Sequence, residues 1–133
     1  MRFVLDENLP PPFARSLNTL SERDGNSVAH VRDFVGPAVS DVEWIAAITT
    51  GEQSVVVSGD RRMLTRAHEL QALRASGFTT FVLAAGWSGL IFWEKAWLLT
   101  RWWPTIIELG TAAPSGTIFR VPHRHRPTMI RPL

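Results

Sequence analysis

Three aspartates in the chain stand at positions from which their carboxylates can act together. Asp6 directly follows a short apolar run, Asp60 follows the valines of VVVSGDRRM, and Asp41 opens a segment that reads DVEW. Carboxylates brought within several ångströms of one another repel unless a cation lies between them. Hard divalent cations such as Mg²⁺ and Mn²⁺ take oxygen ligands of this kind. The three residues therefore predict a divalent-metal site of Asp6, Asp41 and Asp60.

The elements that must position these aspartates alternate between strands and helices. Short apolar or β-branched runs predict strands at residues 2–5, 28–31, 54–57, 79–83 and 117–121. The run of valines shows no alternation, as expected of a central parallel strand that is covered on both faces. This order predicts a three-layer α/β/α sandwich with a mostly parallel central sheet and right-handed crossovers.

Helical patterns occupy the segments between the expected strands. The patterns predict helices over about 11–20, over 40–50 behind the S-x-x-E capping box of Ser40, over about 61–76, and over the Trp-rich segment after residue 89. In the third helix, Met63, Ala67 and Leu70 form a stripe that we expect to end at Gly77. We expect the Trp-rich helix to be bent or restarted near Pro104.

The carboxyl ends of parallel strands meet at one edge of a sheet, where ligands usually bind. Asp6 and Asp60 follow strands directly and are expected at that edge. Asp41 lies at i, i+4, i+7 with Ile45 and Ile48, so it belongs to the stripe that should face the sheet, whereas Glu43 occupies the third position of the capping box. We therefore predict that Asp41 points inward in preference to Glu43.

Each acidic residue also has a purely structural explanation. The structural explanation for Asp60 is that it merely caps the N-terminus of the following helix, and for Asp41 that it merely complements the dipole of its helix. Glu69 shares a helical face with Arg62 and Arg66, which indicates a solvated strip of ion pairs. Ser58 either holds a metal-bound water or is simply a small residue in a tight turn. His30 and His68 are isolated in the sequence and are interpreted as structural.

Composition indicates a single globular domain. The chain has 133 residues, 45% hydrophobic and 20% charged, with a net charge of +2 and no cysteine, which excludes disulfides, thiolate chemistry and cysteine-based zinc sites. The apolar stretch 90–109 carries charges that a membrane span would hold at high cost, and residues 1–8 do not resemble a signal peptide. We therefore expect a cytoplasmic protein with no membrane partner. Residues 1–121 should form the domain, and residues 122–133 a basic C-terminal tail.

The segments FVLDENLP, SDVEWI and VVVSGDRRM resemble the PIN-like nuclease superfamily, especially the group that begins with Asp-Glu-Asn and includes VapC-type toxins. The resemblance covers about residues 1–109. It implies a PIN fold and a metal-dependent endoribonuclease that uses Mg²⁺ or Mn²⁺. It also implies that Asp6 is the first acid, Asp41 the acid on the helix, and Asp60 the acid after the third strand. An RNA substrate and a protein antitoxin follow from the same resemblance.

The chain departs from this family at Arg62, where many relatives have a further Asp. The loss of an acid lowers the local negative charge and leaves open whether the site holds one or two metals. Glu7, Glu43 or Glu69 are alternative sources of the missing oxygen. Alternatively, Arg61 or Arg62 contacts the scissile phosphate.

Two other functions fit parts of the same pattern. A catalytically silent PIN-like binding module would keep the acids without turnover, and Arg62 favours this reading. A receiver-like phospho-acceptor domain also uses acids after its first and third strands, but it needs a lysine after a late strand, and the only lysine, Lys95, lies in the Trp-rich helix. Trp93 and Trp97, with Trp102 and Trp103, suggest a homodimer or antitoxin contact, since Trp is enriched in interfaces.

Overall fold

The computed structural model describes residues 1–36, 39–49, 53–126, 128 and 130–133. Within these ranges the side chains of Asp41, Val42, Thr49 and Arg61 are not described. The predicted end of the second helix at Thr50 and Gly51 lies outside the described residues.

A six-stranded sheet forms the centre of the molecule, with the strand order β2-β1-β3-β4-β5-β6. The strands are β1 (Arg2–Leu5), β2 (Ser27–His30), β3 (Ser54–Ser58), β4 (Thr79–Leu83), β5 (Ile118–Val121) and β6 (Arg131–Pro132). The first five run parallel, and β6 is antiparallel to β5. The mostly parallel sheet and its late fifth strand are therefore confirmed.

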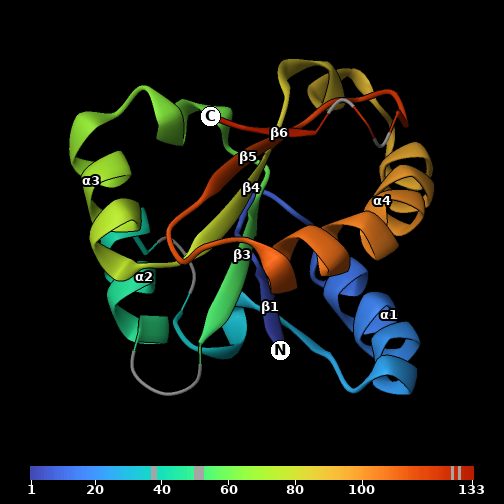
Figure 1. Cartoon of the computed structure of the whole chain (residues 1–133), viewed down its shortest axis with the longest axis horizontal. Helices are drawn as coiled ribbons and strands as arrows, with labels where there is room; N and C mark the ends of the chain where they lie inside the picture. Colours follow the sequence, from blue (N-terminus) through green and yellow to red (C-terminus); the bar gives the residue numbers. More distant parts are fainter. Residues whose placement is uncertain (37–38, 50–52, 127, 129) are drawn as a thin grey trace.

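Two layers of helices cover this sheet (Figure 1). The α-helices are α1 (Pro11–Ser21), α2 (Asp41–Thr49), α3 (Ala67–Ser76) and α4 (Phe92–Ala112). Short 3₁₀ turns are η1 (Glu22–Asp24), η2 (Val31–Asp33), η3 (Arg61–Leu64) and η4 (Ala85–Gly89). Helices α1 and α4 lie on one side of the sheet and α2 and α3 on the other, in agreement with the predicted three-layer sandwich.

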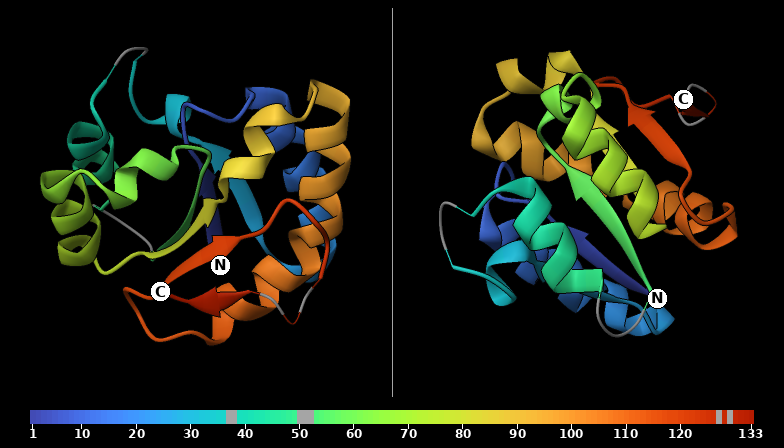
Figure 2. Two further views of the ribbon diagram at one scale, coloured as in Figure 1. Left: turned by 90° about the horizontal axis from the view of Figure 1, so that it is seen from above. Right: turned by 90° about the vertical axis from the view of Figure 1, so that its left-hand side faces the viewer.

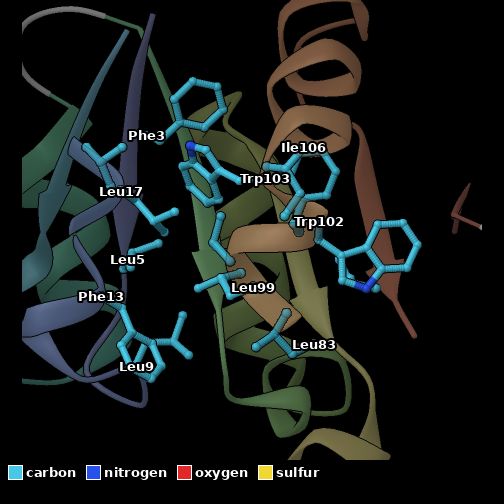
Figure 3. Close-up of a cluster of buried hydrophobic side chains, with 14 of the residues drawn as sticks. Phe3, Leu5, Leu9, Phe13, Leu17, Leu83, Leu99, Trp102, Trp103 and Ile106 are labelled. Atoms are coloured by element: carbon cyan, nitrogen blue, oxygen red, sulfur yellow. The ribbon is translucent and has the colours of Figure 1, made fainter. Parts of the chain in front are cut away.

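The larger core lies between the sheet and the α1–α4 layer (Figure 3). Phe3 from β1 meets Trp103 from α4 edge to face, with 5.4 Å between the ring centroids. Trp102 and Ile106 are also fully buried in this layer. The second half of α4 is thus anchored to the sheet by side chains that recur at helical spacing.

A smaller core lies on the opposite face, beneath α2 and α3. Val4 and Val56 come from the sheet, and Trp44, Ile45 and Ile48 from α2 pack against them, all at most 3% exposed. The predicted inward stripe of α2 is therefore confirmed for its two isoleucines. Successive residues of a strand point to opposite faces, which explains why valines of one strand serve both cores.

The predicted third helix is wrong in its start and in its buried stripe. A 3₁₀ turn occupies Arg61–Leu64, and α3 begins only at Ala67. Ala67 is exposed and Leu70 is half-buried, whereas Leu73 is buried. Because the turn and α3 are separate segments, residues spaced at helical intervals across both do not share one helix face. Gly77 ends α3 with a left-handed φ of 74°, as predicted.

The Trp-rich segment forms a single helix, α4, that includes Pro104 in its interior. Trp102 and Trp103 are buried, while Trp93 and Trp97 are 75% and 60% exposed. Core packing therefore accounts for Trp102 and Trp103 but not for Trp93 and Trp97.

No helix among the described residues is long and apolar enough to cross a bilayer.

The segment 122–133 returns to the sheet at its end. Arg131–Pro132 forms β6 along the outer edge of β5, and Ile130 is 8% exposed within the larger core. Figure 2 shows β5 and β6 side by side at one side of the sheet. The terminal arginine of the basic tail is thereby held in a defined position.

Candidate active site

Asp6 lies at the carboxyl edge of the sheet and is 1% exposed. Its backbone N–H continues the ladder by donating to the carbonyl of Val57 at 3.1 Å. Its Oδ1 accepts hydrogen bonds from the N–H groups of Asn8 and Gly59, both at 3.1 Å. A buried carboxylate needs such donors, because an ionised group without them would be very costly to bury.

Ser58 links the two predicted strand-end aspartates. Its hydroxyl donates to Asp6 Oδ2 at 2.5 Å and accepts from the N–H of Asp60 at 3.0 Å. Ser58 is fully buried, so these are the contacts that satisfy its hydroxyl. Ser58 therefore joins the carboxylate of Asp6 to the main chain of Asp60, and the carboxylate of Asp60 takes no part in this link. A role for Ser58 in this link was not foreseen from the sequence, although its position in a strand-ending turn was the available signal.

Asp60 is held by its own turn and by two arginines. Its Oδ1 accepts from the N–H of Arg62 at 3.0 Å and from Arg62 Nε at 3.1 Å. Arg66 Nη1 lies 3.8 Å from Oδ2. Asp60 thus does act as an N-cap, here of the 3₁₀ turn Arg61–Leu64. The two arginines offset its negative charge.

Asp41 is the first residue of α2, on the helix whose buried face covers β1 and β3. The hydroxyl of Ser40 accepts from the N–H of Glu43 at 3.2 Å, which is the predicted capping bond. The side chain of Asp41 lies outside the described part of the structure. Its predicted inward direction stays a prediction.

Of the three glutamates considered as substitutes, Glu7 has the most suggestive surroundings. Its Oε2 accepts from Arg32 Nε at 3.0 Å, and its Oε1 is buried without a hydrogen-bond partner in the described part of the chain. Glu43 is exposed. Glu69 is 7% exposed and pairs with Arg66 at 3.2 Å, so the predicted solvated strip is wrong: Glu69 is buried and Arg62 turns to Asp60 instead.

His30 has a structural role, as interpreted from the sequence. It is 2% exposed, its Nε2 lies 2.7 Å from the carbonyl of Leu9, and its Nδ1 accepts from the N–H of Arg32 at 3.1 Å. The ring therefore donates through Nε2 and accepts through Nδ1. It ties the end of β2 to the loop that follows Asp6.

Lys95 lies at the same edge of the sheet, which the sequence did not indicate. It lines a cavity of about 220 Å³ together with Asn8, Gly59 and Ser88. Asn8 and Gly59 are the two residues whose N–H groups hold Asp6. Lys95 does lie in the Trp-rich helix, as the argument against a phospho-acceptor domain held, and α4 brings it to this cavity.

The donor types fit a hard divalent cation. Asp6 and Asp60 supply carboxylate oxygens near the carboxyl edge of the sheet, and Glu7 has a buried carboxylate oxygen without a hydrogen-bond donor among the described residues, but these three acids do not form one metal-binding group. Among the described side chains no three metal-ligating residues lie together, and the side chain of Asp41 is not one of them. The role of Asp41 as a third ligand therefore stays a prediction.

Comparison with known proteins places the site in a family. A family model described as a PIN like domain matches residues 1–85. This match contains β1 to β4, α1 to α3 and all three predicted aspartates, whereas α4, β5 and β6 lie beyond it. Neither a curated protein nor a solved structure matches the chain significantly. The match to the family model covers more than half of the chain, and Asp6 and Asp60 of the chain come after β1 and β3 at one edge of a parallel sheet. The chain therefore belongs to the PIN-like domain family.

Proposed function

We propose that this protein is a metal-dependent endoribonuclease and the toxin of a type II toxin–antitoxin system, of the VapC type. The observation that carries the proposal is the buried Asp6 at the carboxyl edge of the sheet, whose carboxylate Ser58 joins to the main chain of Asp60. Membership of the PIN-like family supports nuclease chemistry, because domains of this family are commonly nucleases. Asp6, Asp41 and Asp60 are the proposed ligands of Mg²⁺ or Mn²⁺.

The proposed reaction is hydrolysis of an RNA phosphodiester. When bound, the cation would lower the pKa of a water molecule and offset the charge that develops on the phosphate. Asp6 serves as a preorganised oxygen donor, since Asn8, Ser58 and Gly59 hold its carboxylate in one orientation. Arg62, which is 67% exposed in its side chain, contacts the scissile phosphate from beside Asp60.

The proposed function also implies a protein partner. The N-terminal half of α4 leaves apolar side chains in solvent: Ile91, Phe92, Trp93 and Trp97 are between 44% and 75% exposed. We call these four residues the aromatic surface. A contiguous exposed apolar patch commonly marks an interaction site. A protein antitoxin, encoded beside this gene, or a second copy of the chain is the proposed occupant.

Cleavage of a structured RNA tests the proposal directly. The purified protein should cleave the RNA with Mn²⁺ or Mg²⁺ and lose this activity with a chelator. Asp6→Asn should remove a ligand charge and reduce cleavage by roughly a hundredfold or more, if the ion carries the chemistry. Asp24→Asn is the matched control, because Asp24 is exposed on η1. Cleavage that persists in the chelator, or in Asp6→Asn, would contradict the proposal.

A catalytically silent binding module is the second candidate. The contacts of Asp60 favour it, since Arg62 and Arg66 already neutralise this carboxylate. Such a module would bind RNA or a protein without cleaving RNA under any metal condition. Absence of cleavage together with retained RNA binding would support the binding module.

A phospho-acceptor function would instead appear as transient labelling of the protein by a small phosphodonor. Neither the nuclease nor the binding module predicts such labelling.

A further inference from the structure

Three adjoining surface hollows run from the acidic site to the outer edge of the sheet. The first, of about 430 Å³, is lined by Arg62, Thr65, Ala84 and Arg120. The next, of about 590 Å³, shares Leu64 and Arg120 with it and adds Arg74 and Leu133. The third, of about 290 Å³, is lined by Arg120, Arg131 and Leu133. Arg120 lines all three hollows, so the hollows adjoin one another around its side chain.

We call this feature the arginine groove and define it by Arg62, Arg74, Arg120 and Arg131. It lies between the η3–α3 segment and the β5–β6 edge, and Figure 1 shows the C-terminus near the chain that leads into α3. All four arginines are exposed. One end of the groove touches the candidate active site, since Arg62 donates to Asp60 at 3.1 Å.

The strand β6 brings two of these arginines together. Arg120 and Arg131 are direct partners in the antiparallel β5–β6 ladder, so their side chains project from the same face of the sheet. Directly opposed like charges destabilise a strand pair. Among the described residues, Arg74, Arg120 and Arg131 have no acidic partner within ion-pair distance. An anionic ligand lying along the groove would offset this repulsion.

The structure separates the basic residues at the end of the chain. Arg131 of the predicted tail belongs to the groove together with Arg120 of β5, whereas His123, Arg124 and His125 line a different hollow with Trp97 and Glu94 of α4. Only the part on β5 and β6 leads to Asp60.

We propose that the arginine groove binds the phosphate backbone of an RNA strand and guides it to Asp6 and Asp60. This inference rests on the proposed function for its substrate class. Arg74, Arg120 and Arg131, which have no acidic partner among the described residues, match a ligand with one negative charge per nucleotide. Arg120 and Arg131 lie outside the family-matched residues 1–85, whereas Arg62 and Arg74 lie within them.

Binding of a labelled, mixed-sequence single-stranded RNA in chelator tests the groove without cleavage. The double variant Arg120→Gln/Arg131→Gln should weaken binding by roughly tenfold at low salt. Its plot of log affinity against log salt concentration should become shallower by about 1.4, which is about 0.7 for each of the two lost phosphate contacts. Arg120→Lys/Arg131→Lys should keep most of the affinity, because it keeps the charge. Thermal unfolding would establish that each variant folds.

Two control pairs remove the same charge elsewhere. Arg15→Gln/Arg23→Gln changes exposed residues of α1 and η1, and Arg124→Gln/Arg126→Gln changes the other part of the tail. Both should retain near-normal affinity and salt slope. If either control pair lost as much RNA affinity as the groove variant, the proposed binding of RNA in the groove would be wrong. Cleavage of the same RNA after adding Mn²⁺ is read separately, so a wild-type protein that binds through the groove but does not cleave would contradict the proposed function alone.

Discussion

At the scale of single residues, the site depends on how its carboxylates are satisfied. Asp6 is buried and accepts from Asn8, Ser58 and Gly59, whereas Asp60 accepts mainly from the turn that it caps and from Arg62. The first arrangement preorganises an oxygen donor. The second stabilises a charge that a metal ion would otherwise neutralise. The two aspartates are therefore expected to respond differently to substitution of their neighbours.

Ser58→Ala should lower the free energy of unfolding by about 1–3 kcal/mol, because it removes a donor from the buried Asp6 and an acceptor from the N–H of Asp60. Urea unfolding measures this change. Ser88→Ala is the control, since the exposed Ser88 hydroxyl bonds only locally, to the carbonyl of Ala85 at 2.9 Å; its effect should stay within about 0.5 kcal/mol. Equal stability of the two variants would contradict the importance of the Ser58 link.

Arg62→Gln should tighten Mn²⁺ binding by about two- to fivefold, because Arg62 competes with a cation for Asp60 and an exposed ion pair contributes roughly 0.2–1 kcal/mol. Isothermal titration calorimetry measures the affinity. Arg15→Gln, which removes the same charge from α1, should leave it nearly unchanged. Weaker Mn²⁺ binding in Arg62→Gln would mean that Arg62 does not oppose the metal.

At the scale of elements, the turns after β1 and β3 support each other. The backbone of Gly59 approaches Asn8 so closely that a Cβ at position 59 would lie 3.0 Å from Asn8 Cβ and 3.3 Å from its carbonyl oxygen. Both residues also donate to Asp6. The close approach of these two turns thus sets the position of the first acid.

Gly59→Ala should destabilise the fold by about 1–3 kcal/mol, because the added methyl group pushes against backbone and a short side chain. It should also reduce RNA cleavage, since the loop that carries Asn8 must shift. Urea unfolding and the cleavage assay measure the two effects. At Gly89 a Cβ would meet nothing within 4 Å, so Gly89→Ala is the control and should be nearly neutral. A stable, fully active Gly59→Ala would show that the turns are not in rigid contact.

At the scale of the whole molecule, α4 joins a buried half to an exposed half. Trp102 and Trp103 anchor its second half in the larger core, and the aromatic surface of its first half stays in solvent. The arginine groove lies between the η3–α3 segment and the β5–β6 edge, and α3 is on the other side of the sheet from α4 (Figure 2). RNA and a protein partner would therefore meet different faces of the molecule.

The double variant Trp93→Glu/Trp97→Glu should be monomeric under conditions in which the natural protein forms a dimer, because charges would replace the most exposed apolar side chains of the aromatic surface. Sedimentation velocity measures the masses. Trp93→Phe/Trp97→Phe keeps an apolar surface and should still dimerise. A natural protein that is monomeric, both alone and with the product of the adjacent gene, would contradict the proposed role of this surface.

Local sequence signals were enough to predict the central features of the fold. Unbroken buried runs such as Val55–Val57 identify parallel strands, because each residue of such a strand is covered on one of the two faces. The capping bond of Ser40 and the glycine end of α3 were likewise local. Asp6 and Asp60 could be predicted to meet, since both directly follow parallel strands.

Only the tertiary structure decided what surrounds those acids. The break before α3 turned Arg62 toward Asp60 and buried Glu69, and the fold of α4 brought Lys95 beside Asn8 and Gly59. The pairing of β6 with β5 placed Arg131 opposite Arg120. These arrangements depend on contacts between residues far apart in the chain, whereas periodicity and capping report only on neighbours within a few turns. The sequence alone therefore determined the layers and the edge at which the acids lie, and long-range packing determined their partners.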